Sequence, residues 1–226
     1  MINMVIPCHR ENYGGRRGQT KYLVVHYTAG DGDTAENNGK YFASQSVGAS
    51  AHWFVDETSA VLSVPEDHIA WHCGAGTYIH PNCRNYNSVA VELCSRKNDQ
   101  GVYYIPEKTL ENGQKLVQKL MKQYGISMEN VLRHYDVTGK NCPAPLVEAG
   151  AWNRFLEGIM RYGTIDAVPQ WGRETVEKLM NRGLLQGDGQ NLNLSLDMLR
   201  ILVILDRADL FEGKPDTAEE NQQAAM

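Results

Sequence analysis

Three side chains of the types that bind transition metals lie in two short stretches of this chain. His134 and Cys142 fall in HYDVTGKNCPAP, and His26 lies near the end of the apolar run KYLVVHYT. A catalytic zinc site takes three such nitrogen or sulfur ligands and leaves a fourth position for water. Any one of these residues alone would more often be a buried core side chain. Together they predict a zinc site, with Lys140 as a cation beside it.

Two further residues have the chemistry that hydrolysis needs. Glu92 is a carboxylate in the otherwise apolar run NSVAVEL, where burial without a purpose or a partner is costly. Such a carboxylate can take a proton from an attacking water; the alternative is a strand-end residue that faces solvent. Lys140 lies two residues before Cys142, where an ammonium group can face a developing oxyanion. Its alternative is a solvated loop lysine.

Regular elements must position these residues, and the pattern of apolar residues predicts several of them. Buried strands are expected at 22–27 and 88–93, and a hairpin is expected from strands at 50–56 and 60–65. Helices are expected at 34–45, with Thr34 as its cap, at 106–124, with Gly125 after its end, and at 146–163. Helices that alternate with strands predict an α/β fold, with a mixed central β-sheet flanked by helices.

The texture of the sequence changes after Gly163. Residues 164–170 suggest a linker, and residues 171–211 suggest two short helices around the polar turn GDGQNLNL at 187–194. So small a unit cannot bury its own apolar surface. We therefore expect a main domain at 1–162, a small helical module at 168–212 that docks on the main domain, forms a homodimer or binds a separate ligand, and a mobile polar tail at 213–226.

Composition excludes several classes of protein. The net charge of −5, with no basic stripe, argues against nucleic acid as a partner. No apolar run has the length of a membrane span, and the N-terminus lacks the pattern of a signal peptide. Five cysteines without regular spacing disfavour a disulfide framework and suit a reducing cytosol. Cys73 and Cys83 remain a possible pair in an oxidising medium.

Four segments carry a resemblance to a known family. YLVVHYTAG, SAHWFVDETSAVLSVPEDHIAWHCG, NYNSVAVELC and VLRHYDVTGKNCPAP lie in this order over roughly residues 20–146. They resemble the zinc-dependent N-acetylmuramoyl-L-alanine amidases, a family that includes phage endolysins and peptidoglycan recognition proteins. The resemblance implies a peptidoglycan hydrolase that cleaves the amide between N-acetylmuramic acid and L-alanine, with Zn²⁺ as its cofactor.

The resemblance also assigns roles to individual residues. It implies that His26, His134 and Cys142 bind zinc, that Glu92 is the general base and that Lys140 stabilises the oxyanion. His72 belongs to a segment that lines the peptide groove in such proteins, and Trp71 and Asn85 are further substrate-binding candidates. Their alternatives are packing into the scaffold for Trp71 and an ordinary turn for Asn85. Some relatives without the strand Glu have a Tyr where this chain has Ala51, which leaves the base role to Glu92.

The resemblance leads to several hypotheses about the origin and role of the protein. A wall-cutting enzyme without an export signal suggests a phage or prophage endolysin, made in the cytoplasm of a bacterial host and active on the wall after release. The helical module would then target the wall or form a homodimer. One rival is a non-catalytic peptidoglycan-binding protein on the same fold, although such receptors typically lack the zinc Cys. Another rival is a structural zinc protein, which usually has four protein ligands.

Overall fold

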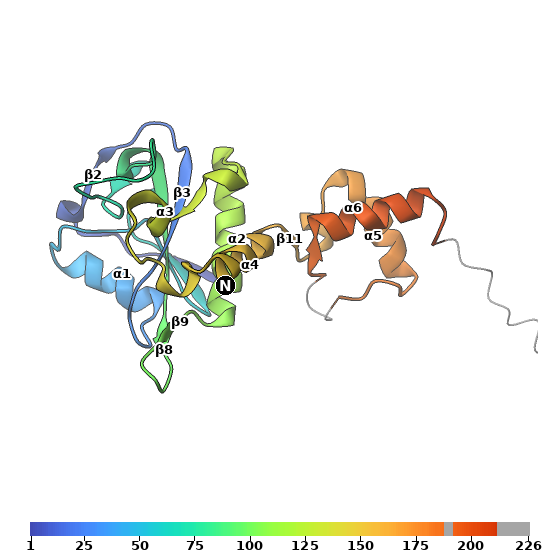
Figure 1. The fold of residues 1–226 in the computed structure, drawn as a ribbon, viewed down its shortest axis with the longest axis horizontal. Helices are drawn as coiled ribbons and strands as arrows, with labels where there is room; N and C mark the ends of the chain where they lie inside the picture. Colours follow the sequence, from blue (N-terminus) through green and yellow to red (C-terminus); the bar gives the residue numbers. More distant parts are fainter. Residues whose placement is uncertain (188–191, 212–226) are drawn as a thin grey trace, which may run out of the picture. The chain divides into compact units, whose positions relative to one another are not determined.

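A computed structural model describes residues 1–187 and 192–211 of the chain. It divides the chain into two compact units, Met1–Ile159 and a second unit that begins at Met160 (Figure 1). The expected tail at 213–226 and part of the expected turn at 187–194 lie outside the described residues. No helix in the described ranges has the length and apolar character needed to cross a membrane.

The first unit is built on a six-stranded mixed sheet with the order β1-β5-β4-β7-β3-β10. Its strands are β1 (Ile2–Val5), β3 (Tyr22–Tyr27), β4 (Trp53–Val55), β5 (Ser59–Leu62), β7 (Ser88–Leu93) and β10 (Val131–Arg133). β4 and β5 are antiparallel, which confirms the expected hairpin, and the other neighbouring pairs are parallel. The sheet therefore mixes both directions, as predicted.

Helices and short ribbons surround this sheet. The α-helices are α1 (Ala35–Ser44), α2 (Glu107–Tyr124), α3 (His134–Thr138) and α4 (Ala149–Ile159). Two ribbons pair β2 (Tyr13–Arg16) with β6 (His68–Ala70) and β8 (Arg96–Lys97) with β9 (Tyr103–Tyr104). Short 3-10 helices are η1 (Arg10–Asn12), η2 (Asn85–Asn87), η3 (Met128–Asn130) and η4 (Ala144–Leu146).

Two of the expected caps hold the helices in place. The Thr34 hydroxyl accepts a hydrogen bond from the backbone N–H of Asn37 at 3.0 Å, at the start of α1. Gly125 ends α2 with a φ of 65°, a left-handed conformation that glycine adopts without strain. Both confirm the sequence prediction.

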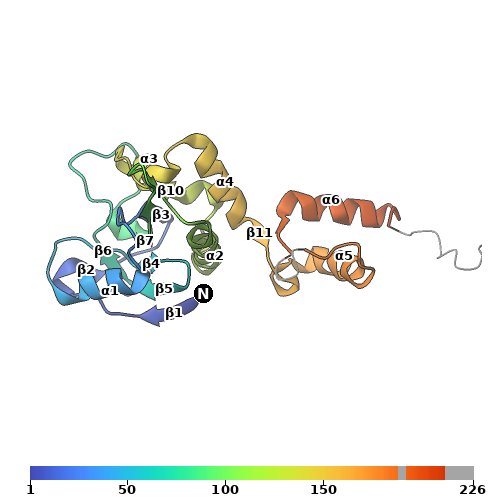
Figure 2. The same ribbon diagram turned by 90° about the horizontal axis from the view of Figure 1, so that it is seen from below.

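The two faces of the sheet have different partners. Side chains at alternate positions of β3 and β7, such as Leu23 and Val91, pack in one core cluster with Leu116 of α2 and Phe155 of α4. Figure 2 shows α2 and α4 together on one side of the sheet and α1 on the other. Since successive side chains on a strand alternate between faces, the intervening positions of β3 and β7 face away from α2 and α4.

The second unit has its own small core. It consists of β11 (Arg161–Tyr162), η5 (Ile165–Ala167), α5 (Gln170–Asn181), β12 (Leu194–Ser195) and α6 (Leu196–Arg207), with β11 antiparallel to β12. The two expected helices are confirmed, and the Ser195 hydroxyl caps α6 by accepting from the backbone N–H of Met198.

The interpretation of residues 164–170 as a linker is wrong. They form η5 and bury Val168 in the same core as Val176 and Leu199. The apolar residues of α5 are only partly internal, because Trp171 and Met180 are 47% and 40% exposed. A tryptophan that lies half in solvent leaves part of this unit's apolar surface uncovered.

Candidate active site

His26 and Glu92 lie side by side at the ends of two central strands. His26 is the fifth of six residues in β3, and it pairs in register with Glu92 of the neighbouring strand β7. Both occupy positions that face away from α2 and α4, by the alternation seen in the core. The apolar pattern of these strands therefore fixes a ring and a carboxylate on the same face of the sheet.

His134 and Cys142 are brought to this place by one loop. His134 is the first residue of α3, directly after β10, which pairs with β3. The backbone N–H of Tyr135 donates to the carbonyl of Cys142 at 2.8 Å, so the loop folds back onto the start of α3. Arg133 strengthens the turn through an ion pair with Asp136, at 2.7 Å between Nη2 and Oδ1. Two residues eight positions apart are thus held next to each other.

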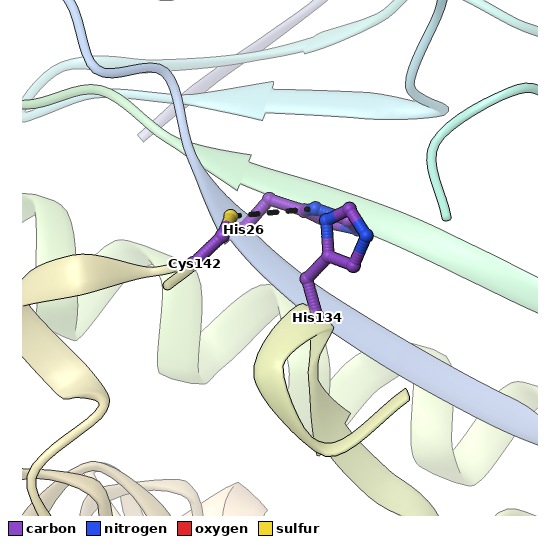
Figure 3. A group of neighbouring side chains, drawn as sticks. All are labelled: His26, His134 and Cys142. Carbon is purple, nitrogen blue, oxygen red and sulfur yellow. Dashed lines mark hydrogen bonds between the residues drawn. The ribbon is translucent and has the colours of Figure 1, made fainter. Parts of the chain in front are cut away.

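The three expected metal ligands form one buried group (Figure 3). One candidate ligand atom from each of His26, His134 and Cys142 lies within 4.8 Å of the others. The Nδ1 of His26 lies 3.7 Å from the Sγ of Cys142. The rings of His26 and His134 approach edge to face, with their centroids 4.7 Å apart.

Burial and nearby charges keep these groups uncharged. Burial lowers the pKa of His134 to about 4, helped by the ammonium of Lys140, and it lowers the pKa of His26 well below its ordinary value. Burial is the main cause that raises the pKa of Cys142 to about 12, and repulsion from Glu92 is the second cause. Neutral imidazoles keep a lone pair for a metal, whereas the thiol must lose its proton when a cation binds.

The donor set and its unsatisfied atoms fit a zinc ion. The Nδ1 of His134 is buried and has no hydrogen-bond partner in the described structure. A buried polar atom without a partner is costly, and a cation held by two imidazoles and a thiolate would satisfy it. Two nitrogens and one sulfur are ligands that zinc accepts in catalytic sites. The residues present therefore suit this metal.

Glu92 lies beside this group, because it pairs in register with His26. Its Oε2 is buried without a hydrogen-bond partner among the described residues. Burial raises the pKa of Glu92 to about 8, although Lys140 acts in the opposite direction. A carboxyl group poised near neutral pH is suited to accepting and returning a proton.

A cavity of about 640 Å³ lies beside the group, with His134 as one of its lining residues. His134, Lys140, Trp71, His72 and Asn85 are among the residues that line it. Lys140 is exposed, so its ammonium group is free to reach a molecule in the cavity. The structure thus places all three substrate-binding candidates on the wall of one cavity.

The three candidates have different surroundings. Trp71 is 38% exposed, which leaves part of its indole for a ligand. The Oδ1 of Asn85 accepts hydrogen bonds from the backbone N–H groups of His72 and Cys73, at 3.2 and 2.9 Å. Asn85 therefore holds the chain that carries His72, while His72 itself reaches the metal group: its Nδ1 lies 3.0 Å from the Nε2 of His26.

Sequence reasoning missed one residue of this site. The hydroxyl of Ser88, the first residue of β7, lies 3.0 Å from the Nε2 of His72. Serine at the start of a strand carries no signal of its own, so only the position of His72 in space reveals it. By contrast, His52 hydrogen-bonds the backbone of His68 and Ala90, in keeping with a structural role.

The cysteines outside the site are all buried thiols. Cys73 and Cys83 share one core cluster, and neither forms a disulfide in this structure. Their pairing in an oxidising medium stays a prediction.

Comparisons with known proteins were made for the sequence and for the fold. Residues 16–145 match the family model described as N-acetylmuramoyl-L-alanine amidase. The N-acetylmuramoyl-L-alanine amidase CwlL of Bacillus licheniformis is 39% identical over 137 residues, which cover 56% of this chain and 37% of CwlL. CwlH of Bacillus subtilis is 33% identical over 156 residues, covering 68% of this chain and 58% of CwlH. The chain spans about half the length of the curated relatives it matches.

Solved structures share the architecture of the first unit. A mutant structure of PlyL has a TM-score of 0.60 and 28% identity, covering 70% of this chain and 98% of that one. The catalytic domain of XlyA has a TM-score of 0.59 and 29% identity, covering 70% and 97%. A structure described as a mutant endolysin from Bacillus subtilis has a TM-score of 0.59 and 29% identity, covering 70% and 99%.

Proposed function

Because this chain belongs to the N-acetylmuramoyl-L-alanine amidase family, we propose that it hydrolyses peptidoglycan at the amide between N-acetylmuramic acid and L-alanine. The observation that carries the proposal is the buried group of His26, His134 and Cys142, with Glu92 beside it. A cavity lined by His134 and Lys140 gives a substrate access to this group.

Zinc is the proposed cofactor, held by His26, His134 and Cys142. When bound, it lowers the pKa of a water molecule and polarises a carbonyl group. The chain's own residues would transfer the proton and stabilise the negative charge. Glu92 takes the proton of the attacking water and returns it to the nitrogen of the departing L-alanine. Lys140 donates a hydrogen bond to the carbonyl oxygen as it gains negative charge.

A non-catalytic peptidoglycan-binding protein is the competing function. Binding alone has no use for a carboxyl group buried without a partner, because burial of such a group costs stability. Glu92 is in that position here, next to a complete set of ligands. This favours the enzyme.

Purified bacterial walls provide the direct test of the reaction. Incubation with the protein should release new amino-terminal L-alanine and should create no new reducing sugar ends. A protein that sediments with walls but creates no new amino-terminal L-alanine and no new reducing sugar ends would support the binding function instead.

We also propose that the chain acts as a phage or prophage endolysin. The support is its likeness to a structure described as an endolysin from Bacillus subtilis. In that role it would be made in the cytoplasm of the bacterial host and would reach the wall after release.

The second unit is proposed as a small module for wall targeting or homodimer formation, with targeting preferred. α6 exposes Met198, Ile201 and Ile204, which are 48%, 56% and 64% exposed and recur every three residues along the helix. α5 adds Trp171, which is 47% exposed. Exposed apolar side chains that recur along one helix can mark an interaction surface.

Truncation separates the two units. A chain that ends after Tyr162 keeps the whole of Met1–Ile159, so zinc binding and cleavage of soluble wall fragments should be retained. Sedimentation with intact walls, or the molecular mass in solution, should fall. Ile201→Ser with Ile204→Ser in the full chain removes two of the exposed apolar residues and keeps the unit, and it should cause the same kind of loss. An unfolded truncated chain would show that the second unit is part of the catalytic core.

A further inference from the structure

A line of hydrogen bonds leads away from the metal group into the protein. The Nε2 of His26 lies 3.0 Å from the Nδ1 of His72. The other nitrogen of that ring, Nε2, lies 3.0 Å from the hydroxyl of Ser88. The Ser88 hydroxyl in turn donates to the backbone carbonyl of Arg84 at 2.7 Å. Three side chains and one carbonyl are thus connected in sequence.

The last contact sets the direction of all the others. A carbonyl oxygen can only accept, so the single proton of the Ser88 hydroxyl goes to Arg84. Ser88 must then accept from the Nε2–H of His72. A neutral imidazole with its proton on Nε2 has a lone pair on Nδ1, and that lone pair accepts from the Nε2–H of His26.

This direction of the hydrogen bonds fixes the tautomer of His26. With its proton on Nε2, the ring has its lone pair on Nδ1, and this atom lies 3.7 Å from the Sγ of Cys142. Metal ligation needs that lone pair. A ligating histidine commonly donates its other N–H to a fixed partner, which sets its tautomer and orientation.

We propose that His72 and Ser88 are positioning residues that hold His26 in the tautomer with its proton on Nε2, so that Nδ1 is free to bind the metal. The proposal rests on the metal site of the proposed function. It assigns His72 a part in building the site, in addition to its place on the cavity wall.

Burial and backbone contacts keep this line rigid. Ser88 is fully buried and His26 is 2% exposed, so water does not compete easily for these bonds. The side chain of Asn85 accepts from the backbone N–H of His72, which fixes the segment that carries the ring. If Ser88 instead donated to a neutral His72, His72 would donate to His26, and His26 would have its proton on Nδ1, where it blocks the metal.

The ring protons can be observed directly in the metal-free protein. Nitrogen-15 NMR of labelled histidine, with signals assigned from single His variants, reports which ring nitrogen carries the proton. We expect the proton on Nε2 in both His26 and His72. A His26 ring with its proton on Nδ1 in the metal-free wild-type protein would overturn the proposal.

Removing the hydroxyl of Ser88 tests the same line of hydrogen bonds by a second measurement. Ser88→Ala should leave the His26 proton shared between its two nitrogens and weaken zinc binding about 10–100-fold in competition with a chelator. Ser63→Ala is the matched control, because Ser63 is also a buried serine (2% exposed); its tautomers and zinc affinity should equal those of the wild type.

The outcomes separate this proposal from the metal site itself. A folded Ser88→Ala protein with wild-type tautomers and wild-type zinc affinity would overturn the positioning role. If Ser88→Ala does not fold, the ring measurement on the wild type decides. A wild-type protein that binds no zinc would overturn the metal site, and the tautomer of His26 would still be read independently.

Discussion

Glu92→Gln is expected to keep its metal and lose most of its turnover. The amide has nearly the same shape as the carboxyl group but cannot accept the proton of the attacking water. General acid–base catalysis contributes about 10²–10⁴-fold to such reactions, so the rate of wall cleavage should fall by this factor. The fold should survive, because the Oε2 of Glu92 has no hydrogen bond to lose in the described structure. Cleavage rate and zinc content are measured on the same sample.

Glu66→Gln is the matched control for this change. Glu66 is also a half-buried carboxylate, but it accepts hydrogen bonds from Trp53, Gln123 and Tyr124, away from the metal group. Its variant should cleave walls at close to the wild-type rate. If Glu92→Gln does so too, another residue is the base.

Cys142→Ser is expected to lose both zinc and activity. Cys142 is 4% exposed and supplies the sulfur of the ligand group. A serine hydroxyl does not ionise near neutral pH and replaces a thiolate poorly as a zinc ligand. Loss of an outer partner alone costs about 10–100-fold in metal affinity, so the loss of a ligand should cost at least that much. Chelator competition and wall cleavage measure the two effects.

Cys8→Ser provides the control for this second prediction. Cys8 is buried to a similar degree, at 7% exposed, and its thiol donates to the carbonyl of Phe42, a bond that a serine can also make. Zinc content and activity should be unchanged in this variant. Full zinc occupancy in Cys142→Ser would remove the residue from the ligand set.

The long elements could be predicted from sequence because their signals are local. β3 and β7 are mostly apolar runs, and α1 and α2 have recognisable caps. Several short strands outside the predicted hairpin had no such signal. β1, for example, has only four residues, and it exists because it pairs with β5 more than fifty residues later. Contacts between distant segments decide such elements, and no local pattern contains them.

The candidate site also divides into residues with a sequence signal and residues whose role depends on contacts between distant segments. Residue type and spacing pointed to His26, His134 and Cys142, and the fold places one atom of each in a single group. The role of Ser88 depends on where the ring of His72 lies, which the sequence does not reveal. Residues 164–170 were mistaken for a linker because their apolar residues follow no helix or strand period, and the burial of Val168 depends on the helices that follow.

The most direct test of the central claim is mass spectrometry of walls digested in water labelled with oxygen-18. Hydrolysis of the proposed amide places the heavy oxygen in the lactyl carboxyl group of N-acetylmuramic acid and leaves L-alanine with a free amino terminus. We predict this pair of products, in amounts that fall together in Glu92→Gln. Label in a sugar reducing end or at a different peptide bond would contradict the proposed reaction.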